Sequence, residues 1–175
     1  MFDISILKNL EEYKLLPTHL WSKTCFACGE ENPHGLHMKF YTDEKYLFSK
    51  LKLQEEKRGW DVIAHGGILS TILDEVMAWA AIYFTNNIIL TKTMTVEYKR
   101  SVIVDTEIKA VGWVSEQTKK EITLKSQLYN NENIICAEAT GIYAAFSHKV
   151  AKKLHLMTEN SLDNFQTFID TCHNI

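Results

Sequence analysis

Hydrophobic and polar residues alternate along most of the chain with the period of two that is typical of β-strands. Six segments have this pattern and are rich in β-branched or aromatic side chains: residues 36–42, 45–53, 89–98, 102–114, 121–129 and 134–146. Asp43 and Glu44 predict the turn of a hairpin between the first two segments. The Asn-Asn-Glu-Asn run at 130–133 predicts a tight turn between the last two. We therefore expect mostly antiparallel pairing.

One central segment has helical periodicity and almost no polar face. Residues 66–84 place apolar side chains around well over half of a helical wheel, so this helix must be buried. Weaker helical patterns at 4–16 and 154–175 predict peripheral helices at the two ends. Residues 21–35 contain glycines, a proline and two cysteines, and they predict an ordered loop.

These elements predict an α+β fold in which one antiparallel six-stranded sheet curls around one long central helix, since no other element can cover that helix. A single domain over residues 1–175 is expected, because no repeat or linker divides the chain.

Composition narrows the function classes. A net charge of −3 argues against a nucleic-acid-binding platform, and a hydrophobic content of 46% argues against disorder. The apolar stretch at 76–84 is too short for membrane insertion, and the first twenty residues do not have the pattern of a secretory leader. Four cysteines are too few for a disulfide framework. We expect a cytoplasmic protein that uses neither nucleic acid nor membrane as a partner.

Two adjacent carboxylates, Asp74 and Glu75, interrupt the apolar helix. A buried carboxylate is costly unless it is paired or used, so one interpretation is a general base or nucleophile in a pocket. The alternative is a narrow polar stripe on the helix beside Ser70 or Thr71.

The helix is preceded by His65 and begins with Gly66 and Gly67. Unpaired N–H groups at a helix N-terminus can hold a ligand oxygen, and glycines allow it to approach the main chain. A turn that needs positive φ is the alternative, with His65 as a structural cap. Asp74 follows Gly66 by eight positions, or roughly 12 Å of helix, so both can act on one carbonyl only across a subunit interface.

The run GWDVIAHGGILSTILDEVMAWAA, followed by TKTMTVEYKRSV and AEATGIYAAF, resembles the hotdog-fold acyl-CoA thioesterases of the phenylacetate-pathway type in the 4-hydroxybenzoyl-CoA thioesterase superfamily. CFACGEENPHGLHMKF resembles the Cys-x-x-Cys-Gly-x-x-Asn-Pro-x-Gly-Leu lead-in of a subset of these proteins. The resemblance covers a core of about residues 25–147 and leaves helical extensions at 4–16 and 154–175 outside.

The resemblance implies a hotdog fold and hydrolysis of an acyl-CoA by a homodimer or homotetramer, without a cofactor. It implies that Asp74 is the catalytic carboxylate and that the Gly66 N–H is the oxyanion donor. His65 would lie beside the carbonyl, and Thr91 would help to position water. It implies no role for Glu75.

Further candidates for substrate binding are Gly67 at the helix start, Trp60 and Met77 for the acyl group, and Arg100 for the coenzyme A phosphates. Core packing is the preferred explanation for Trp60 and Met77, and a solvated strand end explains Arg100 equally well.

Three alternatives remain. A zinc site made by Cys25, Cys28, His34 and His37 matches zinc-module spacing poorly, so no metal is expected. A hotdog hydratase or dehydratase would not explain Asp74. A non-catalytic acyl-CoA-binding protein would gain nothing from a buried carboxylate.

Overall fold

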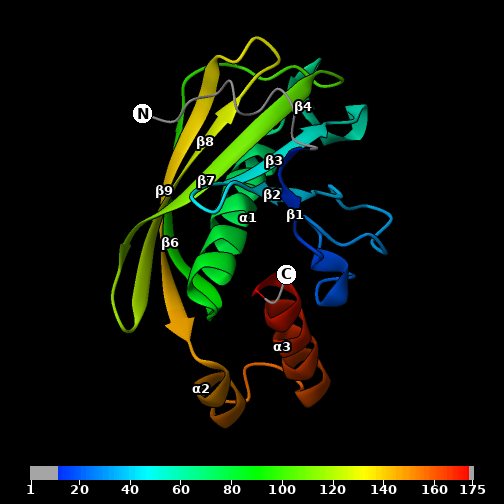
Figure 1. Ribbon diagram of the computed structural model, residues 1–175. Coiled ribbons are helices and arrows are strands. Elements are labelled where there is room, and N and C mark those ends of the chain that lie inside the picture. Colours follow the sequence, from blue (N-terminus) through cyan, green and yellow to red (C-terminus); the bar gives the residue numbers. More distant parts are fainter. Residues whose placement is uncertain (1–11, 174–175) are drawn as a thin grey trace.

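The computed structural model describes residues 12–173. A curved antiparallel sheet with the strand order β1-β2-β3-β7-β8-β9-β6 wraps around one long helix, α1 (Figure 1). The sheet strands are β1 (Lys14–Leu15), β2 (Phe40–Thr42), β3 (Leu47–Lys52), β6 (Ile88–Tyr98), β7 (Glu107–Gln117), β8 (Glu121–Tyr129) and β9 (Ile135–Phe146). A separate ribbon pairs β4 (Arg58–Trp60) with β5 (Ile63–Ala64), and the helices are α1 (Gly66–Thr85), α2 (His148–Lys153) and α3 (Glu159–His173).

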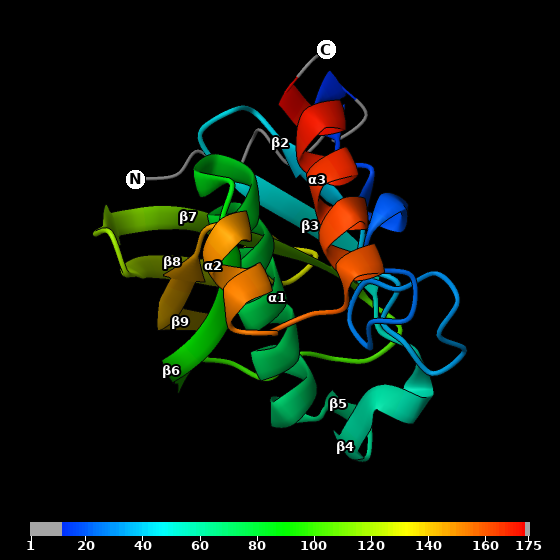
Figure 2. The same ribbon diagram turned by 90° about the horizontal axis from the view of Figure 1, so that it is seen from below.

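The helix α1 is enclosed on both sides, as its nearly uniform apolar pattern requires. The inner face of the sheet covers one side, and α3 with the N-terminal loop covers the other (Figure 2). Aromatic rings join these parts: Trp79 of α1 lies 5.2 Å from the ring of Phe168 and 5.7 Å from that of Trp21. By length and composition α1 could span a membrane, but here it is the core helix of the protein.

The six predicted strands are present, and the sheet has a seventh, the two-residue β1. The start of β7 was predicted too early, at 102 instead of Glu107. Residues 102–104 hydrogen-bond instead to β5 and its approach, through Ala64 N–H to the Val102 carbonyl at 2.8 Å. Asp105 then has a φ of 60°, which breaks the extended conformation before β7 begins.

The predictions for the two ends of the chain have different outcomes. The predicted C-terminal helix is confirmed as α3, and the short α2 before it was not predicted. The predicted N-terminal helix at 4–16 falls mostly on residues outside the described part. Within the described part it is wrong, because Lys14 and Leu15 pair with Thr42 and Tyr41 of β2.

Candidate active site on the central helix

Asp74 lies in the middle of α1, on the side that faces β6 and β9. Its Oδ1 accepts a hydrogen bond from the Tyr143 hydroxyl at 2.7 Å and another from Thr91 Oγ1 at 3.1 Å. Tyr143 also lies 3.3 Å from the Asp74 main-chain carbonyl. The two hydroxyls fix one carboxylate oxygen, while Oδ2 has no hydrogen bond from the residues that the structure describes.

Tyr143 is fully buried in β9. Its burial, and then the negative charge of Asp74, raise its pKa well above that of a free tyrosine. The hydroxyl is therefore protonated at neutral pH and acts as the donor. Asp74 itself is only half-buried, so the oriented carboxylate remains within reach of a substrate.

The start of α1 has a distinct arrangement of donors. His65 is the N-cap, and its Nδ1 accepts a hydrogen bond from the Gly67 N–H at 2.9 Å. The Gly66 N–H has no acceptor among residues 12–173. The Gly66 carbonyl is occupied, since the Tyr98 hydroxyl donates to it at 2.9 Å.

Neither glycine at this position has positive φ, so a turn that needs a left-handed residue is not the reason for the pair. A Cβ built on Gly66 would meet Tyr98 at 3.6 Å, an ordinary contact, whereas one on Gly67 would lie 3.0 Å from His65 Nδ1. Glycine at position 67 therefore leaves room for the histidine cap. The Gly66 N–H, which has no acceptor among the described residues, is the better candidate for binding an oxyanion.

Gly66 and Asp74 lie on the same helix, eight residues apart. On a straight helix this is roughly 12 Å, so one carbonyl cannot reach both within a single chain. The structure thus brings Thr91 to Asp74 in the middle of α1, and it places His65 and Gly66 together at the N-terminus of this helix.

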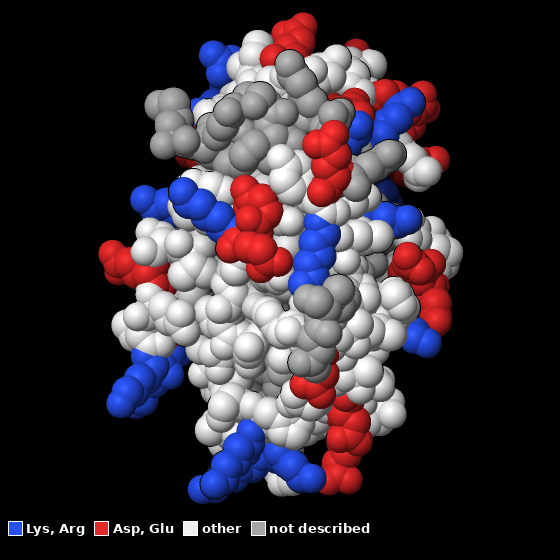
Figure 3. Space-filling model, viewed as in Figure 1, with Lys and Arg blue, Asp and Glu red and all other residues white. Residues whose placement is uncertain are grey.

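The remaining predicted binding residues are dispersed. Trp60 on β4 is 83% exposed, and Met77 is fully buried in the core, where its Cε would lie 3.2 Å from a Cβ on Gly141. Arg100 is exposed and donates to the Ile135 carbonyl at 3.0 Å. On the face shown in Figure 3, basic and acidic side chains are interspersed.

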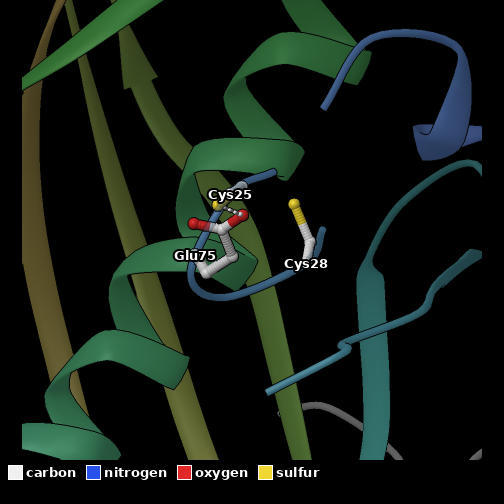
Figure 4. A group of neighbouring side chains, drawn as sticks. All are labelled: Cys25, Cys28 and Glu75. Carbon is white, nitrogen blue, oxygen red and sulfur yellow. Dashed lines mark hydrogen bonds between the residues drawn. The ribbon is translucent and has the colours of Figure 1, made fainter. Parts of the chain in front are cut away.

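Glu75, next to Asp74, points to a different part of the protein. Its Oε1 accepts from Trp79 Nε1 at 2.9 Å and lies 3.6 Å from the Cys25 sulfur. Figure 4 shows Cys25 and Cys28 of the N-terminal loop turned toward this carboxylate. Burial raises the pKa of Glu75 to about 7, and hydrogen bonding from Cys28 lowers the pKa of Cys25 to about 5.

Sequence reasoning missed Tyr143 and the partners of Glu75. A tyrosine in a strand of alternating pattern gives no sign of what it contacts until the register of β9 is known. The Cys-x-x-Cys pair is visible in the sequence, but Glu75, the residue that both sulfurs approach, lies 47 positions after Cys28.

Comparisons with known proteins agree with this architecture. Residues 63–137 match the protein-family model described as Thioesterase superfamily. No curated protein sequence matches the chain. Among solved structures, the thioesterase superfamily protein RHA08564 has a TM-score of 0.65 at 18% identity, over 80% of this chain and 73% of that one.

Two bacterial structures are similar at the same level. A Streptococcus mutans UA159 protein bound to acetyl CoA has a TM-score of 0.59 at 16% identity, over 63% of this chain and 89% of that one. The Escherichia coli PaaI protein from the phenylacetic acid degradation operon has a TM-score of 0.58 at 15% identity, over 64% and 81%. The chain therefore has the predicted hotdog fold, and its segment from β5 into β9 matches the Thioesterase superfamily.

Proposed function

We propose that the protein is an acyl-CoA thioesterase that hydrolyses a fatty or aromatic acyl-CoA to the free acid and coenzyme A. The observation that carries this proposal is the Asp74 carboxylate, held through Oδ1 by the Tyr143 and Thr91 hydroxyls and unpaired at Oδ2 among the described residues. The family match over residues 63–137 and the acetyl-CoA-bound S. mutans structure support the substrate class.

Asp74 would act through its unpaired Oδ2. As a general base it would take a proton from water, which then attacks the thioester carbonyl; as a nucleophile it would attack the carbonyl itself. Either path breaks the C–S bond and adds the elements of water, so that the acid and the coenzyme A thiol result. Thr91 and Tyr143 are positioning residues, because they act through the carboxylate that they orient.

The Gly66 N–H would stabilise the negative charge that develops on the thioester oxygen, with His65 beside it. Because the helix separates Gly66 from Asp74, the site requires a second copy of the chain, in a homodimer or a homotetramer of two dimers. The long strand β6 supports this: it is the outermost strand of the sheet and is largely exposed, and proteins normally cover such an edge.

The exposure of the other predicted binding residues decides which of them could contact the substrate. Trp60 and Gly67 are exposed near the start of α1 and are candidates for contacting the acyl-CoA. Arg100 is exposed and, besides the Nη1 that donates to the Ile135 carbonyl, has further guanidinium donors that could meet a phosphate. Met77 would act only as the wall behind Asp74, since it is fully buried. A cytoplasmic location and membership of the phenylacetate-pathway type are part of the same proposal.

The test is release of free thiol from acetyl, medium-chain, long-chain and aromatic acyl-CoA esters by the purified protein and by Asp74→Asn. Turnover that is lost in the variant supports the proposal. Tight acyl-CoA binding without turnover of any ester would overturn it in favour of a binding protein.

A mixed dimer tests the shared site. Chains carrying Asp74→Ala are expected to be inactive and chains carrying Gly66→Pro to lose about 100-fold in kcat, and mixing them should restore one intact site per heterodimer. Absence of recovery at every mixing ratio, with heterodimers verified, would contradict a site built from two subunits.

A further inference from the structure

Three potential metal ligands from two distant segments converge on the side of α1 that faces the N-terminal loop. The sulfurs of Cys25 and Cys28 and a carboxylate oxygen of Glu75 all lie within 4.8 Å of one another. This cluster is separate from the Asp74 centre, which faces β6 and β9. His34 and His37, the partners considered from the sequence, are exposed and do not belong to it.

The spacing fits a tetrahedral ion. Zinc bonds of about 2.3 Å to sulfur and 2.0–2.2 Å to oxygen put neighbouring ligand atoms about 3.5–3.8 Å apart. The distance from Cys25 Sγ to Glu75 Oε1 is 3.6 Å. The ligands therefore need only small adjustments to close around one ion.

The loop is already shaped to present its sulfurs. The Ala27 N–H donates to Cys25 Sγ at 3.3 Å, and the Gly29 N–H donates to the Cys25 carbonyl at 3.0 Å. A Cβ on Gly29 would lie 2.4 Å from the Lys23 carbonyl oxygen and 2.5 Å from the Cys25 nitrogen, so only glycine allows this tight winding. An N–H directed at sulfur stabilises a thiolate, the form that binds metal.

The carboxylate is oriented from behind. Trp79 Nε1 donates to Glu75 Oε1 at 2.9 Å, as outer partners of metal ligands commonly do. No lysine or arginine forms an ion pair with Glu75 in the described part of the chain. Two thiolates and this half-buried carboxylate would together carry three negative charges, of which a divalent cation compensates two.

We propose that Cys25, Cys28 and Glu75 bind one Zn²⁺ ion, with water in the fourth position, and that this ion fastens the N-terminal loop to α1. Thiolate ligands select zinc over magnesium or calcium, and structural zinc sites are almost always four-coordinate and tetrahedral. The role is structural, since the cluster faces the N-terminal loop and Asp74 faces β6 and β9. The proposal does not depend on thioesterase activity.

The direct test is titration of the reduced, metal-free full-length protein with Co²⁺, followed by displacement with Zn²⁺. We expect a thiolate-to-cobalt charge-transfer absorption that saturates at about one equivalent and disappears when zinc is added. The protein purified with zinc should retain about one ion per chain after gel filtration.

Variants identify the ligands. Cys25→Ser and Cys28→Ser should abolish the charge-transfer absorption, and Glu75→Gln should weaken zinc binding at least about 100-fold. Trp79→Phe, which removes only the supporting hydrogen bond, should weaken it about 10-fold. Cys172→Ala removes a cysteine outside the cluster, and Asp74→Asn removes the neighbouring carboxylate; both should bind zinc as the wild type does.

Three results would overturn the proposal. The first is absence of the charge-transfer absorption in folded protein with four titratable thiols. The second is equal zinc content in the wild type and in Cys25→Ser. The third is a Cys25–Cys28 disulfide that persists under the reducing conditions of the titration, since an oxidised pair cannot supply thiolates. Because the cobalt titration uses the wild type, a variant that fails to fold does not affect it.

Discussion

Asp74 and Glu75 are neighbours in the sequence and differ by one methylene group, yet they contact different parts of the protein. Asp74 is half-buried and receives hydrogen bonds from the hydroxyls of Tyr143 and Thr91. Glu75 faces two thiols and an indole N–H. Successive residues on a helix point about 100° apart, so α1 presents one carboxylate to the sheet edge and the other to the loop.

The roles that we propose for the two carboxylates follow from their partners and not from their residue type. Hydroxyl donors leave a carboxylate free to act on a substrate, because they orient it without neutralising it. Burial, and then the negative charge of a Cys25 thiolate beside it, raise the pKa of Glu75 to about 7. Oε1 of Glu75 is also occupied by the Trp79 indole and lies beside the Cys25 sulfur, so this carboxylate is placed to hold a proton or a cation at the loop.

The largest expected effect separates the two carboxylates directly. Asp74→Asn keeps the size of the side chain and removes its charge, so kcat for the best acyl-CoA ester should fall at least about 1000-fold. Acyl-CoA binding and zinc content should both be retained, measured by isothermal titration and by metal analysis. Loss of zinc in this variant would mean that the two centres are not separate.

The second effect concerns the oxyanion donor. Proline is tolerated at the first residue of a helix, and His65 has a ψ of 132°, which suits a residue before proline. Gly66→Pro therefore removes the N–H while α1 keeps its start, and kcat should fall about 100-fold.

Gly66→Ala is the matched control for this substitution. It keeps the N–H, and its Cβ would make only an ordinary contact with Tyr98, so its loss in kcat should be at least about tenfold smaller than that of the proline variant. Equal losses in the two variants would show that the glycine matters for space and not for its N–H.

The sequence predicted α1 closely, from residue 66 to 84 against the observed Gly66–Thr85, because a nearly continuous apolar pattern has no competing interpretation. Asp74, Gly66 and His65 could be chosen as candidates for the same reason: polar residues and glycines stand out on such a helix. A role for Thr91 in positioning water is expected only from the family resemblance, and its hydrogen bond to Asp74 was not predicted.

Residues that depend on register or loop shape could not be found in this way. Tyr143 reaches Asp74 because β9 pairs with β6 in one register, with Tyr143 opposite Thr91. The loop around Cys25 has no regular period, so its approach to Glu75 follows from tight local contacts such as those at Gly29. The same limit applies to residues 102–106, where a positive φ at Asp105 delays the start of β7.

The third effect lies on the loop side of the helix. Zinc that binds only the folded state, at a free concentration about 100 times its dissociation constant, should stabilise the protein by about 2.7 kcal/mol. Removing zinc with a chelator should therefore lower the Tm by about 5–10 °C, measured by scanning calorimetry. Cys25→Ser should have the lower Tm and no response to the chelator; an unchanged Tm for the wild type would contradict a structural ion.

The smallest effect sharpens the role of the hydroxyl beside Asp74. Tyr143→Phe removes one hydrogen bond to a charged oxygen and should lower kcat about tenfold with little change in KM. Burial and the Asp74 charge raise the pKa of Tyr143 above the ordinary value of 10.0, so the hydroxyl stays protonated as the pH rises from 7 to 9. The ratio of wild-type to variant kcat should therefore be the same at both pH values. A ratio that falls toward one at pH 9 would mean that the tyrosine loses its proton there, and that Asp74 is oriented by Thr91 alone.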